Sequence, residues 1–229
     1  MPRDLPIFPL PLVLFPGALQ TLHIFEPRYR RLLADSLERD RRFGIAYVRE
    51  TLGGDPAPRP GDVGCVAEIR ETQALPDGRS NIVTVGGRRF TLVEWLPSAR
   101  DYRLARVEEF ADDPADPAEA GAVGGDVRRD FRRLLAALAT LTDRTEQPPG
   151  LPDDPELLSF QVAAQLELEP PAKLELLRLR STIARLRSLA AVLAPLAADA
   201  ERRALVHGHA RGNGKSGLRP DIERTARHP

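Results

Sequence analysis

The sequence predicts an α+β fold with a β-rich N-terminal half and a helical C-terminal half, on three observations. Short apolar runs at residues 7–15 and 19–25 flank the breaker pair Pro16-Gly17. Between residues 62 and 109, apolar and polar side chains alternate around turn residues, which is typical of strands with one buried face. Beyond residue 126, apolar side chains recur every three or four positions, which indicates amphipathic helices.

One early helix is expected inside the β-rich half, directly after the second apolar run. Glu26 puts negative charge at the positive end of this helix, and Pro27 occupies the first turn, where a proline loses no hydrogen bond. From Tyr29 onward, apolar side chains recur at helical spacing. We expect Gly44 to close the helix and residues 43–50 to form the next strand.

The strands are expected to form a closed or nearly closed sheet. Many short strands with Gly and Pro turns favour a small barrel, and Asp77-Gly78 is a strong hairpin signal. Pro9 and Pro11 cannot donate ladder hydrogen bonds, so the first strand should lie at a sheet edge or a barrel seam. The Gly- and Pro-rich stretch 51–61 is either a surface insertion or a binding loop.

Composition sets the expected boundaries, because residues 111–125 contain mostly Asp, Pro, Ala and Gly. Asp154-Pro155-Glu156 marks the start of a second C-terminal helix, and Pro195 should kink or end the last one. The expected organisation is a β domain over 1–110, a linker over 111–125, a helical subdomain over 126–200 and a flexible tail over 201–229.

The charge balance excludes some classes of partner. Lys+Arg and Asp+Glu both total 33, so no general electrostatic attraction to nucleic acid or anionic membrane is expected. Cys65 is the only cysteine, which excludes an intrachain disulfide and favours the cytoplasm. No apolar run is long enough to span a bilayer.

The chemistry-bearing residues do not assemble into a catalytic pattern. GNGKS near the C-terminus lacks a phosphate-loop glycine, because His209 occupies that position. The only lysines, Lys173 and Lys215, are expected on a surface helix and in the tail, where neither forms a Ser-Lys pair. His23 is expected on a half-exposed strand without a nucleophile beside it. We therefore predict a non-enzyme without cofactor or metal.

A series of motifs carries a family resemblance. PLPLVLFPG, then LHIFEPRYRRLL, then FGIAYV resembles the opening of the Lon N-terminal domain family, the substrate-binding part of the ATP-dependent protease Lon, which also occurs as a stand-alone protein. VGCVAEI, DGRSNIVTVGGRRF, YRLARVE and LPDDPELLSFQVAAQLELEP follow in the family's order, up to about Leu196. The resemblance implies a PUA-like pseudo-barrel and, because neither the ATPase nor the peptidase module is present, a stand-alone form.

A binding surface is the remaining functional expectation. Aromatic rings beside guanidinium groups suit unfolded polypeptide, since the rings provide contact area and the arginines bind carboxylates and carbonyls. We predict a non-catalytic module for unfolded or partner polypeptides, linked to protein quality control or proteolysis. Its candidate contacts are Phe15, Phe25, Arg28, Tyr29, Arg30 and Arg31. Alternatively, the rings belong to the core and the arginines form a solvated helix face.

RNA binding is the alternative function. PUA-like barrels are often RNA modules, and Arg88 and Arg89 lie beside Phe90. The neutral overall charge and the small number of candidate stacking aromatics weigh against this alternative.

Overall fold

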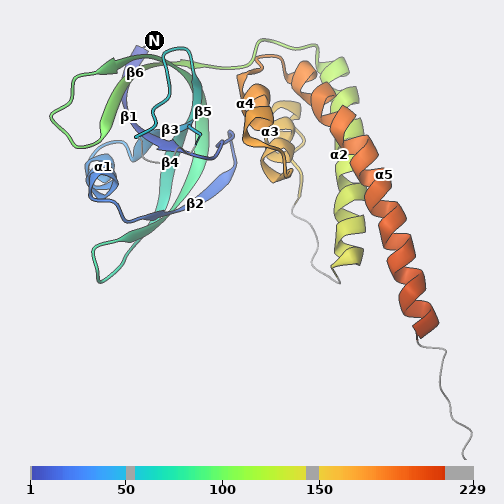
Figure 1. The fold of residues 1–229 in the computed structure, drawn as a ribbon. Coiled ribbons are helices and arrows are strands. Elements are labelled where there is room, and N and C mark those ends of the chain that lie inside the picture. Colours follow the sequence, from blue (N-terminus) through green and yellow to red (C-terminus); the bar gives the residue numbers. More distant parts are fainter. Residues whose placement is uncertain (1, 50–54, 143–149, 215–229) are drawn as a thin grey trace, which may run out of the picture.

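The computed structural model describes residues 2–49, 55–142 and 150–214, and it confirms the predicted α+β class (Figure 1). A barrel-like sheet with one early helix lies at one side, and four further helices lie at the other. In chain order the elements are β1 (Pro2–Leu10), β2 (Leu19–Ile24), α1 (Pro27–Leu37), β3 (Arg42–Tyr47), β4 (Val63–Ala74), β5 (Ser80–Leu96), β6 (Arg103–Phe110), α2 (Pro117–Leu141), α3 (Pro155–Gln165), α4 (Pro170–Arg178) and α5 (Thr182–Gly214).

The sheet closes on itself through its longest strand. The strand order is β2-β5-β4-β3-β1-β6, and an additional β5–β6 pairing joins the last strand back to β5. This closure removes most free strand edges, as expected for a pseudo-barrel. Strand β1 lies at the seam: it pairs antiparallel with β6 up to Ile7 and parallel with β3 from Ile7 onward. Each half of β1 thus has one partner, which explains why its prolines are tolerated.

Alternating side chains divide the buried residues of the barrel between two clusters. Ile7, Phe90 and Val107 belong to one cluster, formed by β1, β3, β4, β5 and β6. Phe8 and Ile45 belong to the other, which includes the buried face of α1. The helices α2 to α5 have a core of their own, built mainly from leucine and alanine. Helix α1 is therefore fixed against the barrel, and its position sets the geometry of the site described below.

The start of α1 follows the prediction, but its end does not. Glu26 is the N-cap residue and Pro27 lies in the first turn, although the Glu26 side chain makes no cap hydrogen bond. The helix ends at Leu37, and Gly44 lies inside β3 instead of closing it. A β-carbon at Gly44 would lie 2.7 Å from the Ile7 side chain and 2.9 Å from Phe90. Close packing, not a helix end, requires this glycine.

The structure also differs from the expected linker and tail. Asp116 caps α2 by accepting hydrogen bonds from the backbone of Ala118 and Glu119, so residues 117–125 are helical and only 111–116 lie outside regular secondary structure. Helix α5 continues past Pro195 to Gly214, and around this proline its apolar side packs along α2. Residues 201–214 are thus helical, while 215–229 lie outside the described residues.

Two buried arginines join the barrel to the helices. Arg89 of β5 donates to the carbonyl oxygens of Leu177 and Leu179, at 2.9 and 2.6 Å, and pairs with Asp112. Arg185 of α5 donates to the same aspartate at 2.5 Å and stacks over the Phe160 ring at 3.8 Å. The carboxylate of Asp112 therefore balances two guanidinium groups at the junction of the two halves.

Candidate functional site

Two adjacent hollows lie beside the N-terminal turn of α1. The first, here called the polar hollow, has a volume of about 250 Å³ and is lined by residues of β1, α1, β6 and the β5–β6 connection. The second, here called the apolar hollow, has a volume of about 270 Å³ and lies against β1, β2 and the start of α1. They share Pro9, Arg28, Tyr29 and Asp55. The two hollows together form a bipartite groove.

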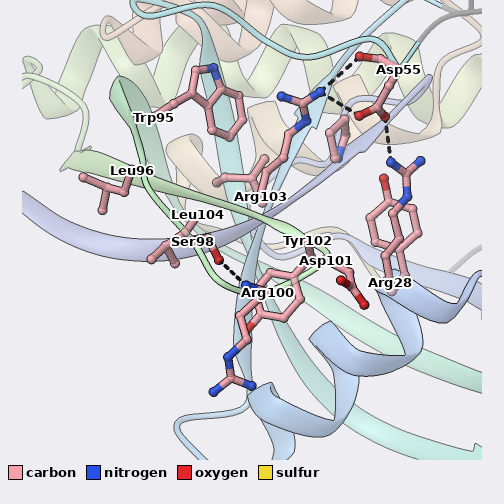
Figure 2. Close-up of a pocket in the computed structure, with 13 residues that line it drawn as sticks. Arg28, Asp55, Trp95, Leu96, Ser98, Arg100, Asp101, Tyr102, Arg103 and Leu104 are labelled. Atoms are coloured by element: carbon pink, nitrogen blue, oxygen red, sulfur yellow. Dashed lines mark hydrogen bonds and ion pairs between the residues drawn. The ribbon is translucent and has the colours of Figure 1, made fainter.

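A charged bridge of three residues separates the hollows; Arg28, Asp55 and Arg103 are here called the Asp55 bridge. Arg28 Nη1 lies 2.7 Å from Asp55 Oδ1, and Arg103 Nη2 lies 2.6 Å from Asp55 Oδ2. Figure 2 shows the two guanidinium groups approaching the carboxylate from different sides. The hydrogen bonds from Arg28 and Arg103 hold the pKa of Asp55 below its ordinary value, despite its partial burial. The carboxylate is therefore ionised at neutral pH.

Aromatic rings support both arginines of the bridge. The guanidinium carbon of Arg103 lies 5.5 Å from the centre of the Trp95 ring, and that of Arg28 lies 4.7 Å from the Tyr29 ring. Tyr29 in turn stacks on Phe8 at 3.9 Å between ring centres. Trp95 donates its indole N–H to the carbonyl oxygen of Pro58 at 3.2 Å. These contacts pre-orient the two guanidinium groups.

A second charged network fixes the floor of the polar hollow. The buried Asp35 of α1 accepts a hydrogen bond from the Tyr102 hydroxyl at 2.8 Å and pairs with Arg100. Burial alone would raise the pKa of Asp35, but the Tyr102 hydrogen bond and the Arg100 charge outweigh it and hold this pKa below its ordinary value. The network ties α1 to the β5–β6 connection, so the polar hollow has rigid walls.

Phe25 gives the apolar hollow an exposed anchor. Its side chain is 58% exposed, which is unusual for a phenylalanine. The ring lies parallel to His23, with 6.0 Å between ring centres, and His23 Nδ1 is 2.7 Å from the side-chain oxygen of Asn81. Phe8, Leu10 and other apolar residues complete the lining. The hollow thus offers apolar contact area next to charge.

The structure brings three of the six expected contact residues together. Phe25, Arg28 and Tyr29 line the apolar hollow, although Tyr29 is a largely buried wall residue. Phe15 is fully buried and lies 6.3 Å from Phe160 in the helical core, so it has no surface to offer a ligand. The sequence alone did not reveal that Phe15 belongs to the core, because an aromatic residue before a turn is equally compatible with a core and a surface position.

The other two arginines of α1 point elsewhere. Arg31 pairs with Asp35 one turn further along the helix, at 3.2 Å. Arg30 lies against the β4–β5 turn, so close to Gly78 that a β-carbon there would collide with the guanidinium group. Arg30 is two positions from Arg28 and faces another side of the helix, whereas Arg31 is turned along the helix by its pair with Asp35. Of these three arginines, only Arg28 lines the groove.

The two residues expected for RNA binding are not a surface pair. Arg88 is exposed, but the side chain of Arg89 is 2% exposed and is used within the protein. Arg89 packs over Phe110 at 4.5 Å as well as binding Asp112. The sequence pattern of two adjacent arginines beside a phenylalanine is thus explained by strand alternation, with one residue facing inward.

Sequence reasoning did not find Asp55, Trp95 or Arg103. Asp55 lies in the Gly- and Pro-rich stretch 51–61, and the length of this stretch was the only sequence signal for a binding loop. Trp95 is the penultimate residue of β5 and Arg103 begins β6, and the hairpin geometry that brings them together is not visible in a single sequence.

Burial changes the pKa values of two side chains with reactive groups, Cys65 and Lys173. Burial raises the pKa of the Cys65 thiol, which keeps it protonated. Lys173 is half-buried, and burial lowers its pKa, contrary to the sequence expectation. Its ammonium group donates to the Ala164 carbonyl oxygen at 3.1 Å, and the hollow that it lines contains no serine.

The described part of the chain has neither a metal-ligand cluster nor a membrane-spanning helix. Across residues 2–49, 55–142 and 150–214, no three His, Cys, Asp or Glu side chains gather as metal ligands would. Within the same ranges, no helix combines the length and apolar character of a membrane span.

The closed barrel with its helical extension is the fold of Lon N-terminal domains. A Lon N-terminal domain protein from Xanthomonas campestris superposes with a TM-score of 0.60 at 26% identity, covering 82% of this chain and 98% of that chain. The N-terminal domain of a Mycobacterium avium complex Lon protease superposes at 0.64 with 17% identity, covering 86% and 99%, which supports the fold alone.

A family model for the ATP-dependent protease La (LON) substrate-binding domain matches residues 4–194. The chain therefore belongs to the Lon substrate-binding domain family. Lon protease 2 of Thermus thermophilus is 27% identical over 197 residues, and Lon protease of Brucella suis is 24% identical over 176 residues. These matches cover 84% and 76% of this chain but 24% and 22% of the two proteases, so the chain spans about a quarter of their length.

Proposed function

We propose that this chain is a non-catalytic module that binds unfolded or partner polypeptides for Lon-type proteolysis in the cytoplasm. The observation that carries the proposal is the bipartite groove beside α1, where the exposed Phe25 adjoins the Asp55 bridge. Family membership supports the same role, because the family is that of a protease's substrate-binding domain.

An extended segment fits the groove better than a folded surface does. The two hollows are each small and share Arg28 and Asp55 of the bridge, with apolar lining in one and polar lining in the other. An apolar side chain of the segment would cover Phe25, and backbone carbonyls would accept hydrogen bonds from arginine. We expect the groove to accept segments of many different sequences, since aromatic and aliphatic contacts depend little on the identity of the side chain.

Binding by one such module is expected to be weak. A single aromatic anchor contributes roughly 2 kcal/mol, whereas micromolar affinity requires about 8 kcal/mol. The groove therefore supports micromolar or weaker affinity for one segment, and tighter capture needs several modules or several segments.

Fluorescence anisotropy with a labelled, reduced and carbamidomethylated model protein, which cannot refold, tests the proposal. Phe25→Ser should weaken binding by about tenfold, which corresponds to about 1.4 kcal/mol. Leu205→Ser is the matched control, because Leu205 is 66% exposed and belongs to the C-terminal third of α5. That end of α5 lies away from the barrel (Figure 1). Equal affinities for the two variants, or no binding by the unaltered protein, would refute the proposed function.

A further inference from the structure

We propose that Arg28 and Arg103 form a carboxylate-binding subsite, that Asp55 occupies this subsite as an internal stand-in, and that a bound polypeptide replaces it with an acidic side chain. The inference rests on the proposed function and deepens it, because it names the chemistry of the preferred segment. It predicts a preference for segments in which an acidic residue lies near aromatic or aliphatic residues.

The geometry of the Asp55 bridge is that of a receptor for one carboxylate. Two guanidinium groups from different elements, α1 and β6, each donate to a different oxygen of the same carboxylate, at 2.7 and 2.6 Å. Charge-assisted hydrogen bonds of this length are the strong class in proteins. Because Tyr29 and Trp95 hold the two arginines by stacking, the subsite keeps its shape when another carboxylate replaces that of Asp55.

The carboxylate of Asp55 is easily displaced from this subsite. Its side chain is 49% exposed, and those of Arg28 and Arg103 are 34% and 38% exposed. Ion pairs at such exposure contribute about 0–1 kcal/mol, so a competing carboxylate displaces Asp55 at little cost. By contrast, Asp35, which holds Arg100 in the same hollow, is buried and stays in place.

The position of the carboxylate-binding subsite favours an acidic side chain in the middle of a bound polypeptide segment. The subsite lies between the two hollows. A polypeptide segment that fills both hollows therefore passes over the subsite and continues on both sides of it. The charged residues that line the polar hollow are three arginines with Asp55 and Asp101. The second aspartate disfavours a doubly charged phosphate, whereas one carboxylate exchanged for another preserves the charge balance.

The test uses pairs of fluorescein-labelled, C-terminally amidated peptides that carry Phe and Leu around one central Asp, or Asn at the same position. With the unaltered protein, the Asp peptide should bind about fivefold more tightly than the Asn peptide. Asp55→Ala should tighten binding of the Asp peptide by about two- to fivefold, since an exposed pair contributes up to about 1 kcal/mol, and should leave the Asn peptide nearly unchanged.

Arg103→Gln should abolish the preference for Asp over Asn. Arg106→Gln is the matched control, because Arg106 lies on the same strand with 43% side-chain exposure, pairs with Asp4 and Glu94, and does not line either hollow. Thermal unfolding of each variant confirms that the fold is retained.

Three results would overturn the inference. Equal binding of the Asp and Asn peptides refutes the carboxylate subsite but leaves the proposed function standing. An unchanged affinity of Asp55→Ala for the Asp peptide refutes the stand-in role. Failure of every peptide to bind any variant overturns the proposed function together with the inference.

Discussion

Arg89 and Asp112 form an ion pair whose side chains are 2% and 3% exposed, although one residue belongs to the barrel and the other to the connection that leads to α2. Arg185 approaches the same carboxylate from α5. Charges are rarely buried so completely unless they are paired, because the loss of hydration costs several kcal/mol per ion. Because these buried charges must stay paired, the ion pairs fix the position of the helices relative to the barrel.

Replacing Asp112 with Asn should destabilise the protein strongly. The change leaves two buried guanidinium groups without a counter-charge, and removing one partner of a buried pair costs about 3–5 kcal/mol. Urea unfolding measures this loss. Asp113→Asn is the control, since Asp113 is 63% exposed and lies 3.4 Å from Arg180; it should change stability by less than about 1 kcal/mol. Similar stabilities of the two variants would contradict the role given to Asp112.

Gly86→Ala should be destabilising where Gly121→Ala is stabilising. A β-carbon at Gly86 would collide with the Phe15 carbonyl, which belongs to the chain backbone and cannot move aside. Overpacking of this kind costs about 1–3 kcal/mol. Gly121 is helical with open space around its Cα, so alanine should stabilise the protein there by about 0.5–1 kcal/mol. Thermal unfolding of both variants gives the two signs, and equal shifts would contradict the packing described for Gly86.

Asp35→Asn should make stability less sensitive to acid. The folded-state pKa of Asp35 lies below the ordinary value of 3.8, so its ion pairs stabilise the protein above that pH. This contribution is lost as the pH falls through the folded-state pKa. The difference in stability between the unaltered protein and Asp35→Asn should be about 2 kcal/mol at pH 7 and should shrink below about pH 4.

Urea unfolding between pH 7 and pH 3 checks the Asp35 prediction. Asp40→Asn serves as the control, because Asp40 is 56% exposed and lies 3.5 Å from Arg3. A difference between the unaltered protein and Asp35→Asn that stays constant over this range would contradict the prediction.

Trp95 should report occupancy of the polar hollow. It is the only tryptophan of the chain, it lines this hollow, and the Arg103 guanidinium lies over its ring. A peptide that engages Arg103 changes the charge next to the indole, so tryptophan emission should shift with the same half-saturation as the anisotropy signal. Emission that stays constant at saturating peptide would place the peptide elsewhere on the surface.

Local signals were sufficient where a few neighbouring residues determine the structure. Glu26-Pro27 predicted the start of α1, and Asp154, whose carboxylate accepts a hydrogen bond from the Leu157 backbone at 2.7 Å, predicted the start of α3. The same reasoning failed for the expected linker over 111–125, and the last helix does not end at Pro195, one of the two outcomes expected there. In both places long-range packing of α2 against α5 stabilises a helix that glycine or proline would weaken in isolation.

The candidate site was only partly predictable, because its members come from distant parts of the chain. Phe25 and Arg28 stood out by their position around the start of α1. Arg103 at the start of β6 and Asp55 in a loop are 48 positions apart in the chain, and no local sequence pattern indicates that they meet in the fold. Arg89 was misassigned for the same reason, since its partner Asp112 lies 23 positions away.

Photo-crosslinking from the site itself tests the central claim most directly. Benzoylphenylalanine at position 25, in place of Phe25, and at position 205, in place of Leu205, gives two exposed probes of which only the first lies in the groove. With the unfolded model protein, the account predicts crosslinks from position 25 that unlabelled polypeptide suppresses, and background levels from position 205. Equal crosslinking from both positions, or none from position 25, would contradict it.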